Sequence, residues 1–166
     1  MNAKKSKLYY HKTTPHQVEN IVPEIREITP SETLPVRHEV MWPNKPLDYV
    51  KLPNDKNGRH FGLCINGKII SILSLFIKNN EVQFRKFATL TEFQGLGYGT
   101  ILLKNIIALV KKEGVKKIWC NARIEKSAFY ERFLLKSTNT KFHKGGIDYV
   151  IMERNFISIK ENKNKG

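Results

Sequence analysis

Residues 84–114 read as a strand, a glycine-rich turn and one helix, and this unit limits the possible folds more than any other part of the chain. Residues 84–90 mix aromatic, β-branched and long side chains, as strands do. From Thr100, apolar residues recur at three- and four-residue spacing until Gly114, which is typical of an amphipathic helix that ends at a left-handed glycine. The sequence therefore predicts a strand that leads into a helix through a turn with three alternating glycines.

The three glycines of this turn, Gly95, Gly97 and Gly99, suggest a ligand. The first N–H groups of a helix have no intrahelical partner, and the aligned peptide dipoles place about half a positive charge there. Glycines carry no Cβ atom that would hold a ligand away from these N–H groups, so a phosphate could approach them. The turn is a candidate phosphate site, and a strand-to-helix turn without a ligand is the equally open alternative.

Two common nucleotide motifs fit this turn poorly. A P-loop ends in Gly-Lys-Ser/Thr, whereas Tyr98-Gly99-Thr100 contains no lysine. The Rossmann fingerprint needs a third glycine where Thr100 stands, and an acid about twenty residues further on. The next strand-like segment, residues 115–121, ends without a carboxylate. Neither nucleotide fold is therefore favoured.

The pattern that remains is Gln94-x-x-Gly97-x-Gly99 between a strand and a helix. It resembles the acetyl-CoA pyrophosphate loop of the GCN5-related N-acetyltransferases (GNAT). The likeness extends from roughly residue 25 to residue 152, and residues 85–89 resemble that family's splayed fourth strand. Arg37, Asp55 and His60, in their local sequence, also resemble an ElaA-like bacterial subgroup of small acetyltransferases.

The resemblance implies acetyl-CoA as the acetyl donor, and no metal. The thioester arm would pair with the exposed main chain of the splayed strand, as an added peptide strand does. A backbone N–H of that strand would polarise the thioester carbonyl, and the pyrophosphate would lie on amides of the turn. The residues expected to bind the cofactor are Phe87, Ala88, Thr89, Gln94, Gly95, Leu96, Gly97, Tyr98, Gly99, Thr100 and Arg123, of which Arg123 stands where the family often has an asparagine.

Tyr130 is the candidate general acid, because the segment 128–131 resembles the one that carries the family's tyrosine. A phenol with a pKa of about 10 stays protonated at neutral pH and can give its proton to a departing thiolate. The alternative is a tyrosine that packs its ring on the core. The family's usual Gly-Phe pair is replaced here by Leu134-Leu135, so the turn after this helix must be built differently.

His60 is the candidate general base, because imidazole exchanges protons near neutral pH. A histidine that opens a strand is more often structural, and ordered water could replace a side-chain base. The other side chains considered as bases are Glu39, Asp55 and Glu92. Arg37 and Arg85, with Lys86, are candidates to position an acidic group of the substrate, or are solvated.

The net charge of +14 raises the possibility of a nucleic-acid-binding domain. Much of this charge lies in the two end segments, and no basic stripe interleaved with aromatic residues runs along the chain. Positive potential would also favour the anionic phosphates of CoA. A nucleic-acid partner is therefore the third interpretation, after an enzyme and a CoA-binding module without catalysis.

The length of 166 residues fits one domain over residues 21–157. We expect a loosely ordered basic segment over residues 1–20 and a basic tail over residues 158–166. No apolar run suits a membrane span or a signal peptide, so a cytoplasmic protein without a membrane partner is expected. Cys64 and Cys120 lie in apolar strand-like runs and are predicted to be buried free thiols.

Turn signals divide the domain into further elements. Asn66-Gly67 and Asn79-Asn80 predict two hairpins, and Gly145-Gly146 predicts a closing one. Strands are expected at residues 24–28, 60–65, 68–77, 81–90 and 115–122, and helices at 30–43, 100–114 and 127–135. The strand at 115–122 should run parallel to the strand before the glycine turn, through a right-handed crossover. The predicted fold is α/β, with a mixed, mostly antiparallel central sheet flanked by helices, of the acyl-CoA N-acyltransferase type.

The sequence is thus interpreted as an acetyl-CoA-dependent N-acetyltransferase that moves an acetyl group to a primary amine by direct transfer in a ternary complex. The acceptor stays open among small amines, amino sugars, drug-like amines, peptide N-termini and protein lysines, because acceptor-binding loops vary most. A monomer or a homodimer is expected.

Overall fold

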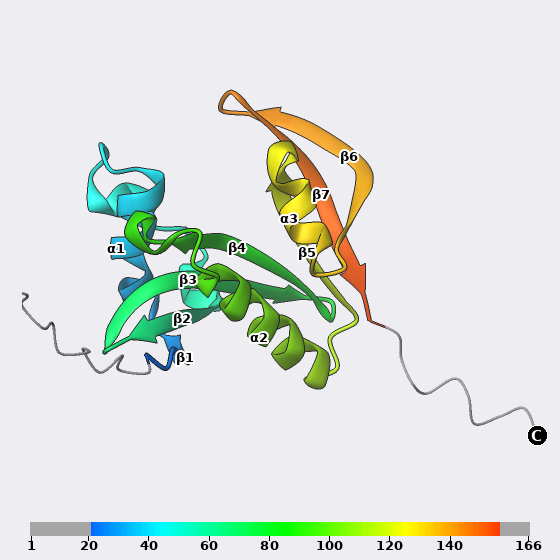
Figure 1. Ribbon diagram of the computed structural model, residues 1–166. Coiled ribbons are helices and arrows are strands. Elements are labelled where there is room, and N and C mark those ends of the chain that lie inside the picture. The colour runs from blue at the N-terminus through cyan, green and yellow to red at the C-terminus, as the bar shows by residue number, and fades with distance from the viewer. Residues whose placement is uncertain (1–20, 157–166) are drawn as a thin grey trace, which may run out of the picture.

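A computed structural model describes residues 21–156 of the chain. One seven-stranded sheet runs through them, in the order β1-β2-β3-β4-β5-β7-β6 (Figure 1). The strands are β1 (Glu24–Ile28), β2 (Arg59–Ile65), β3 (Lys68–Lys78), β4 (Glu81–Thr89), β5 (Lys117–Arg123), β6 (Lys136–Lys144) and β7 (Ile147–Asn155). The loosely ordered segment expected at residues 1–20 and the tail expected at 158–166 lie outside the described residues.

Only the β4–β5 pair is parallel, and the other neighbouring strands are antiparallel. The predicted mixed, mostly antiparallel α/β fold is confirmed. The Asn66-Gly67 turn has positive φ at both residues, as a type I′ hairpin requires. Asn79-Asn80 also has positive φ twice and closes the β3–β4 hairpin. The β6–β7 hairpin turns at Gly145-Gly146, as expected.

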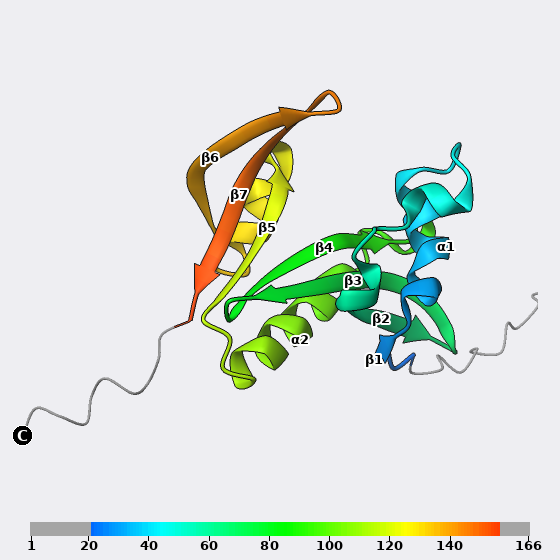
Figure 2. The ribbon, with the colours of Figure 1, turned by 180° about the vertical axis from the view of Figure 1, so that it is seen from behind.

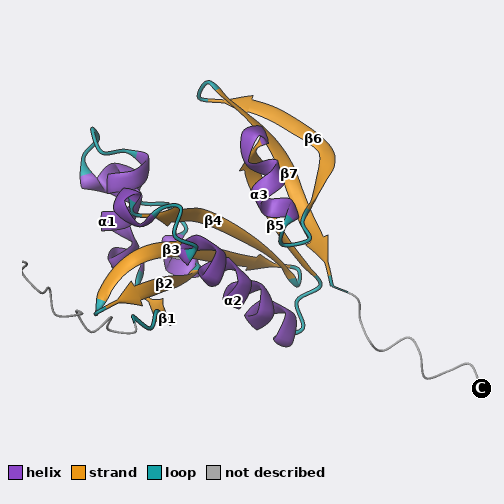
Figure 3. Ribbon diagram, viewed as in Figure 1, coloured by secondary structure: helices purple, strands orange, loops and turns teal. Residues whose placement is uncertain are grey.

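Within the described residues three α-helices accompany the sheet: α1 (Pro30–Met41), α2 (Tyr98–Lys112) and α3 (Ser127–Glu131) (Figure 3). Helices α1 and α2 pack on opposite faces of the β2–β4 part of the sheet (Figures 1 and 2). Helix α2 buries the apolar stripe that its period predicted, namely Leu102, Leu103, Ile106, Ile107 and Val110. Its first residue is Tyr98, so the helix starts two residues before the expected Thr100.

The start of α1 at Pro30 agrees with the prediction. The cap is Thr29, which forms a capping box with Glu32, and Pro30 follows in the first turn. The Glu32 side chain accepts from the Thr29 N–H at 2.7 Å, and the Glu32 N–H donates to the Thr29 hydroxyl at 3.3 Å. The helix ends at Met41, close to the expected stop near Pro43.

Helix α3 is shorter than the expected span 127–135, since it ends at Glu131. Leu134 then adopts a left-handed conformation with φ of +64°, and Leu135 is buried in the core with 1% of its surface exposed. Leu134 therefore makes the turn that glycine usually makes, while Leu135 fills an apolar site.

Strand β4 separates from β5 after a short parallel contact. The two strands pair only at Glu81↔Lys117, Val82↔Ile118 and Gln83↔Trp119, and then diverge (Figure 1). On its other side, β4 is bulged against β3: Arg85 pairs with Ser74 and Ala88 with Ile72, so Lys86 and Phe87 lie outside the register. Lys86 takes a left-handed φ of +52°. The fold thus has the splayed fourth strand that the resemblance implied.

Candidate active site

The loop between β4 and α2 leaves the start of α2 open. Gly97 is the N-cap residue with φ of +88°, and no side chain among the described residues caps the helix. The first intrahelical bond joins the Ile101 N–H to the Gly97 carbonyl at 3.0 Å, so the N–H groups of the first turn have no partner within the helix. The first turn also contains no acid that would neutralise the dipole. These amides can bind an anion.

The three glycines serve two different purposes. Gly95 and Gly97 have φ of +76° and +88°, and an added Cβ would point into open space. Gly99 has ordinary φ, but a Cβ there would lie 3.2 Å from the Phe87 ring and 3.3 Å from the Thr89 hydroxyl. Gly95 and Gly97 therefore allow the left-handed loop, while Gly99 allows α2 to approach β4. The sequence interpretation had given all three the same purpose.

Gln94 holds the loop against the end of β4. Its side-chain amide donates to the carbonyl of Thr89 at 2.8 Å. Thr89 is held in turn by Ser71, whose hydroxyl lies 2.9 Å from the Thr89 hydroxyl. The first residue of the motif thus fixes the loop through its side-chain Nε2.

Tyr130 lies between the two diverging strands. Its ring packs on Phe84 of β4, at 5.8 Å between centroids, and on Phe129 at 5.2 Å. Burial raises the pKa of its phenol above the ordinary value, the neighbouring Cys120 of β5 raises it further, and Arg123 lowers it. Among residues 21–156 the hydroxyl has no hydrogen-bond partner. Tyr130 therefore stays protonated and has a proton that is free to be donated.

The two cysteines are buried free thiols, as predicted. Burial raises the pKa of the Cys120 thiol to about 12, so this side chain is neutral at physiological pH. It lies in the apolar part of β5 that supports Tyr130.

His60 does not reach a site of chemistry, which corrects the expectation of a general base. It is 1% exposed, and both ring nitrogens are hydrogen-bonded. Nε2 donates to the main-chain carbonyl of Asp55 at 2.8 Å, and Nδ1 lies 2.8 Å from the Ser74 hydroxyl. Because Ser74 accepts from Arg37 at 3.0 Å, its own proton points to Nδ1. No lone pair of His60 is left to accept a proton from an amine.

Arg37 is likewise buried, with no exposed surface, so it cannot contact a substrate. It forms a bidentate pair with Asp55, at 2.8 and 2.9 Å, and donates to the Val50 carbonyl at 3.2 Å. Burial by itself would raise the pKa of Asp55, but the bonds from Arg37 and the Leu52 N–H outweigh it, so the pKa lies below its ordinary value. We call Arg37, Asp55, His60 and Ser74 the buried polar cluster.

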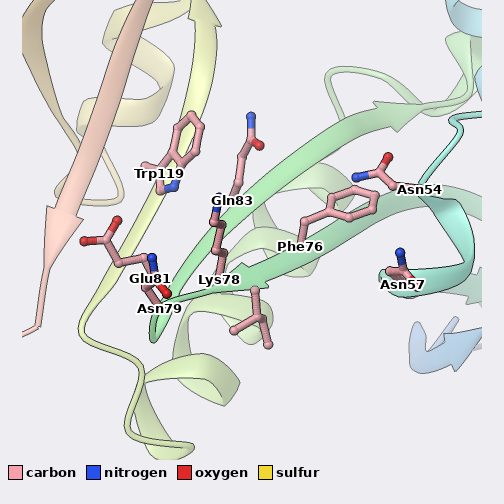
Figure 4. A pocket seen from close by; sticks show the side chains of 9 residues that line it. Asn54, Asn57, Phe76, Lys78, Asn79, Glu81, Gln83 and Trp119 are labelled. Carbon is pink, nitrogen blue, oxygen red and sulfur yellow. The ribbon is translucent and has the colours of Figure 1, made fainter.

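The opposite face of the sheet from α2 carries a cavity of about 600 Å³ where β4 meets β5 (Figure 4). Its floor includes Phe76 of β3, Gln83 of β4 and Trp119 of β5. The remaining lining residues are Asn54, Asn57, Ile77, Lys78, Asn79 and Glu81. We call this side of the sheet the acceptor face, because it lies across the sheet from α2 and its open N-terminus.

Arg85 continues the acceptor face along β4. Its guanidinium lies over the Phe76 ring, 5.5 Å from the centroid. Residues two apart on a strand share a face, so Arg85 lies on the same side as Gln83. Of the two arginines expected to position a substrate, only Arg85 is accessible.

A sequence model described as the Acetyltransferase (GNAT) family matches residues 22–134, more than half of the chain. The chain belongs to the GNAT acetyltransferase family. It is therefore an N-acetyltransferase, as the names of its relatives also indicate. The matched region ends at Leu134 and so includes β4, the glycine loop and Tyr130.

Individual relatives agree with this membership. The uncharacterized N-acetyltransferase YitI of Bacillus subtilis strain 168 is 26% identical over 139 residues, which cover 78% of this chain and 93% of YitI. The ribosomal-protein-S18-alanine N-acetyltransferase of Escherichia coli superposes with a TM-score of 0.69 at 18% identity, covering 85% of this chain and 98% of that one. A GNAT acetyltransferase from Elizabethkingia anophelis with acetyl-CoA bound has a TM-score of 0.62 at 18% identity, with 81% and 98% covered. At these identities the solved structures support the fold alone.

Arg123, the remaining GNAT site residue expected from the sequence, ends β5 beside the site. Its guanidinium is 4.0 Å from Glu125, and its positive charge lowers the pKa of the Tyr130 phenol. Sequence reasoning did not identify Phe76, Gln83 or Trp119 as cavity residues. Strand alternation could have placed Gln83 with Arg85, but only the pairing of β3, β4 and β5 brings the three together.

Among residues 21–156 no group of three or more His, Cys, Asp or Glu side chains could hold a metal ion. None of the helices in this same range is long and apolar enough to cross a membrane.

Proposed function

We propose that the protein transfers an acetyl group from acetyl-CoA to a primary amine by direct transfer in a ternary complex. The observation that carries this proposal is the position of Tyr130 between the diverging strands β4 and β5, while β4 leads into the open N-terminus of α2. Amides for the phosphates thus lie where β4 leads into α2, and a proton donor, Tyr130, lies beside the middle of β4.

Acetyl-CoA would bind along this path. Its pyrophosphate would lie on the amides of residues 95–100, and its thioester arm would pair with the main chain of Phe87, Ala88 and Thr89. The bulge at Lys86 and Phe87 supports this, because it frees main-chain groups of β4 from pairing with β3. One such N–H would polarise the thioester carbonyl. Arg123 would contact the cofactor from the end of β5.

Tyr130 would donate its proton to the thiolate that leaves when the amine attacks. Its raised pKa keeps the acid form populated at any pH at which an amine is a nucleophile. The base is water in this scheme. Of the carboxylates considered for that role, Asp55 binds Arg37, and Glu92 pairs with Lys68 at 3.1 Å.

The departure at Leu134-Leu135 does not favour a module without catalysis. The left-handed turn and the buried apolar side chain are both present, so Tyr130 is held in place despite the changed residues. The cytoplasmic location, the ElaA-like subgroup and the monomeric or homodimeric state stay predictions.

Two measurements test the proposal in sequence. Isothermal titration with acetyl-CoA comes first, and absence of binding at millimolar ligand would contradict every interpretation that involves CoA. Thiol release over a panel of amines comes second, with Tyr130→Phe as control. Binding without thiol release would indicate a non-catalytic CoA module. A salt-sensitive shift of DNA or RNA that survives removal of residues 1–20 and 158–166 would instead support the nucleic-acid interpretation.

A further inference from the structure

Three basic residues in or near the β4 bulge have no acidic partner among the described residues. Arg85 and Lys86 stand at the bulge of β4, and Lys144 ends β6 at the β6–β7 turn. Among residues 21–156 none of the three forms an ion pair or a side-chain hydrogen bond. Arg85 is held only by its contact with the Phe76 ring, which leaves the N–H groups at the edge of its guanidinium free.

The nearby acids are already engaged. The acids of β4 and β7, together with Asp55 and Glu125, each contact a basic side chain other than Arg85, Lys86 and Lys144. These contacts are Asp55 with Arg37, Glu81 and Glu153 with Lys117, Asp148 with His143, and Glu125 with Arg123. These carboxylates therefore do not pair with Arg85, Lys86 or Lys144.

Lys86 shows the effect of this imbalance. Its side chain is half-buried, and burial lowers the pKa of its ammonium group. Repulsion from Arg85, Arg37 and Lys144 lowers it further, and Asp55 offsets only part of the effect. Arg85 and Lys144 are thus close enough to act on Lys86, and an anion placed beside Lys86 would be stabilised.

We propose that the acceptor amine carries an anionic group, a carboxylate or a phosphate, which is bound by Arg85 and Lys86 with Lys144 at the rim. This inference rests on the proposed function, because it assigns the substrate class of the same site. Arg85 and Lys86 directly precede Phe87 and Ala88, the residues expected to hold the thioester arm, so an anion bound there lies beside the point of transfer. A planar guanidinium supported on a ring suits bidentate binding of either anion. The same charges disfavour polycationic acceptors.

Matched acceptor pairs test this inference by thiol release with acetyl-CoA. C-terminally amidated Ala-Glu against amidated Ala-Gln, and glycine against glycinamide, probe the carboxylate, glucosamine 6-phosphate against glucosamine probes the phosphate, and spermidine represents polycations. In at least one pair we expect kcat/KM of the anionic member to exceed that of the neutral member by about tenfold or more. This is the ratio expected when one hydrogen bond to a charged group is gained. Arg85→Gln and Lys86→Gln should each remove most of this preference while leaving the neutral member nearly unchanged.

Lys104→Gln is the matched control, because Lys104 is exposed on α2, and it should keep the preference. Unchanged acetyl-CoA affinity and unchanged thermal midpoints will show that the Arg85 and Lys86 variants are folded. Equal kcat/KM within every pair, or a preference for neutral or cationic acceptors, would overturn this inference and leave the proposed function standing. Absence of thiol release with every acceptor would overturn both.

Discussion

The buried polar cluster under α1 and the open start of α2 both contain groups that seek hydrogen-bond partners, yet their states are opposite. In the cluster, the polar side-chain atoms of His60, Asp55 and Ser74 form hydrogen bonds with one another, with Arg37 and with the main chain. Among the described residues, Arg37 Nε is the single buried side-chain nitrogen or oxygen without a hydrogen-bond partner. At α2, the first-turn amides have neither a side-chain cap nor an acid.

The difference separates structure from chemistry. A buried polar group whose partners are all protein atoms fixes the fold, and removing a partner leaves a costly unpaired group. A polar group that the fold leaves without a partner at an accessible place is ready for a ligand. By this measure the cluster joins α1 and the Asp55–Asn57 turn to β2 and β3, whereas the loop before α2 and Tyr130 have the unpartnered groups that the proposed active site needs.

The largest effect is expected from breaking the cluster. Asp55→Asn leaves the buried Arg37 guanidinium without its counter-charge and should lower the free energy of unfolding by about 3–5 kcal/mol. Urea denaturation followed by circular dichroism measures this. The paired replacement Arg37→Met with Asp55→Leu should lose less, because no charge is left buried.

The same variant has a signature in acid. The pKa of Asp55 is lower when folded, so its stabilisation is complete above the ordinary value of about 3.9 and is lost as the pH falls through the lower folded value. Asp55→Asn should lack this part of the acid dependence. A loss of acetyl-CoA affinity at unchanged stability would show instead that the cluster serves the site.

Tyr130→Phe tests the other region at its reactive end. The turnover rate should fall roughly 100-fold or more, because a general acid typically contributes that much. Stability should change little, since the ring contacts remain and the hydroxyl has no partner to lose. Because the phenol pKa is raised, wild-type turnover should not decline as the pH rises to about 10, the ordinary phenol pKa. Full activity in the variant would remove Tyr130 from the mechanism.

Gly97→Val tests the loop. Valine is strained at φ of +88°, by about 1–2 kcal/mol, and its side chain would obstruct the open amides. Acetyl-CoA should bind about tenfold more weakly, or a loss of about 1.4 kcal/mol, in isothermal titration. Gly97→Asn is the control, because asparagine adopts the left-handed conformation readily. Equal affinity in Gly97→Val and the wild type would count against a phosphate site here.

The smallest effect is expected at the turn after α3. Leu134 is left-handed and 64% exposed, so Leu134→Gly should raise stability by roughly 0.5–1 kcal/mol, the strain relieved minus the added flexibility of the unfolded chain. Thermal unfolding with unchanged turnover would confirm it. The neighbouring replacement Leu135→Ala should instead destabilise by about 2–5 kcal/mol, because that side chain fills the core. Destabilisation by Leu134→Gly would mean that the exposed leucine packs on something.

The sequence by itself determined the features that depend on neighbouring residues. The β4–loop–α2 unit, the hairpin turns at Asn66-Gly67 and Asn79-Asn80, and the apolar stripe of α2 follow from periodicity and turn chemistry, which act over a few residues. The family resemblance rested on the same local patterns. For this reason the fold class and the glycine loop could be predicted.

Only the tertiary structure decided what each polar side chain does. His60 had the chemistry of a base, but its two partners come from residues 55 and 74 in other elements, and no local pattern shows that both nitrogens are engaged. Arg37 is excluded as a substrate-binding residue because it is buried, whereas Arg85 stays a candidate because it lies over the Phe76 ring at the cavity. The physical reason is that hydrogen bonding and burial depend on strands that pair far apart in the chain, whereas the sequence specifies only which groups are present.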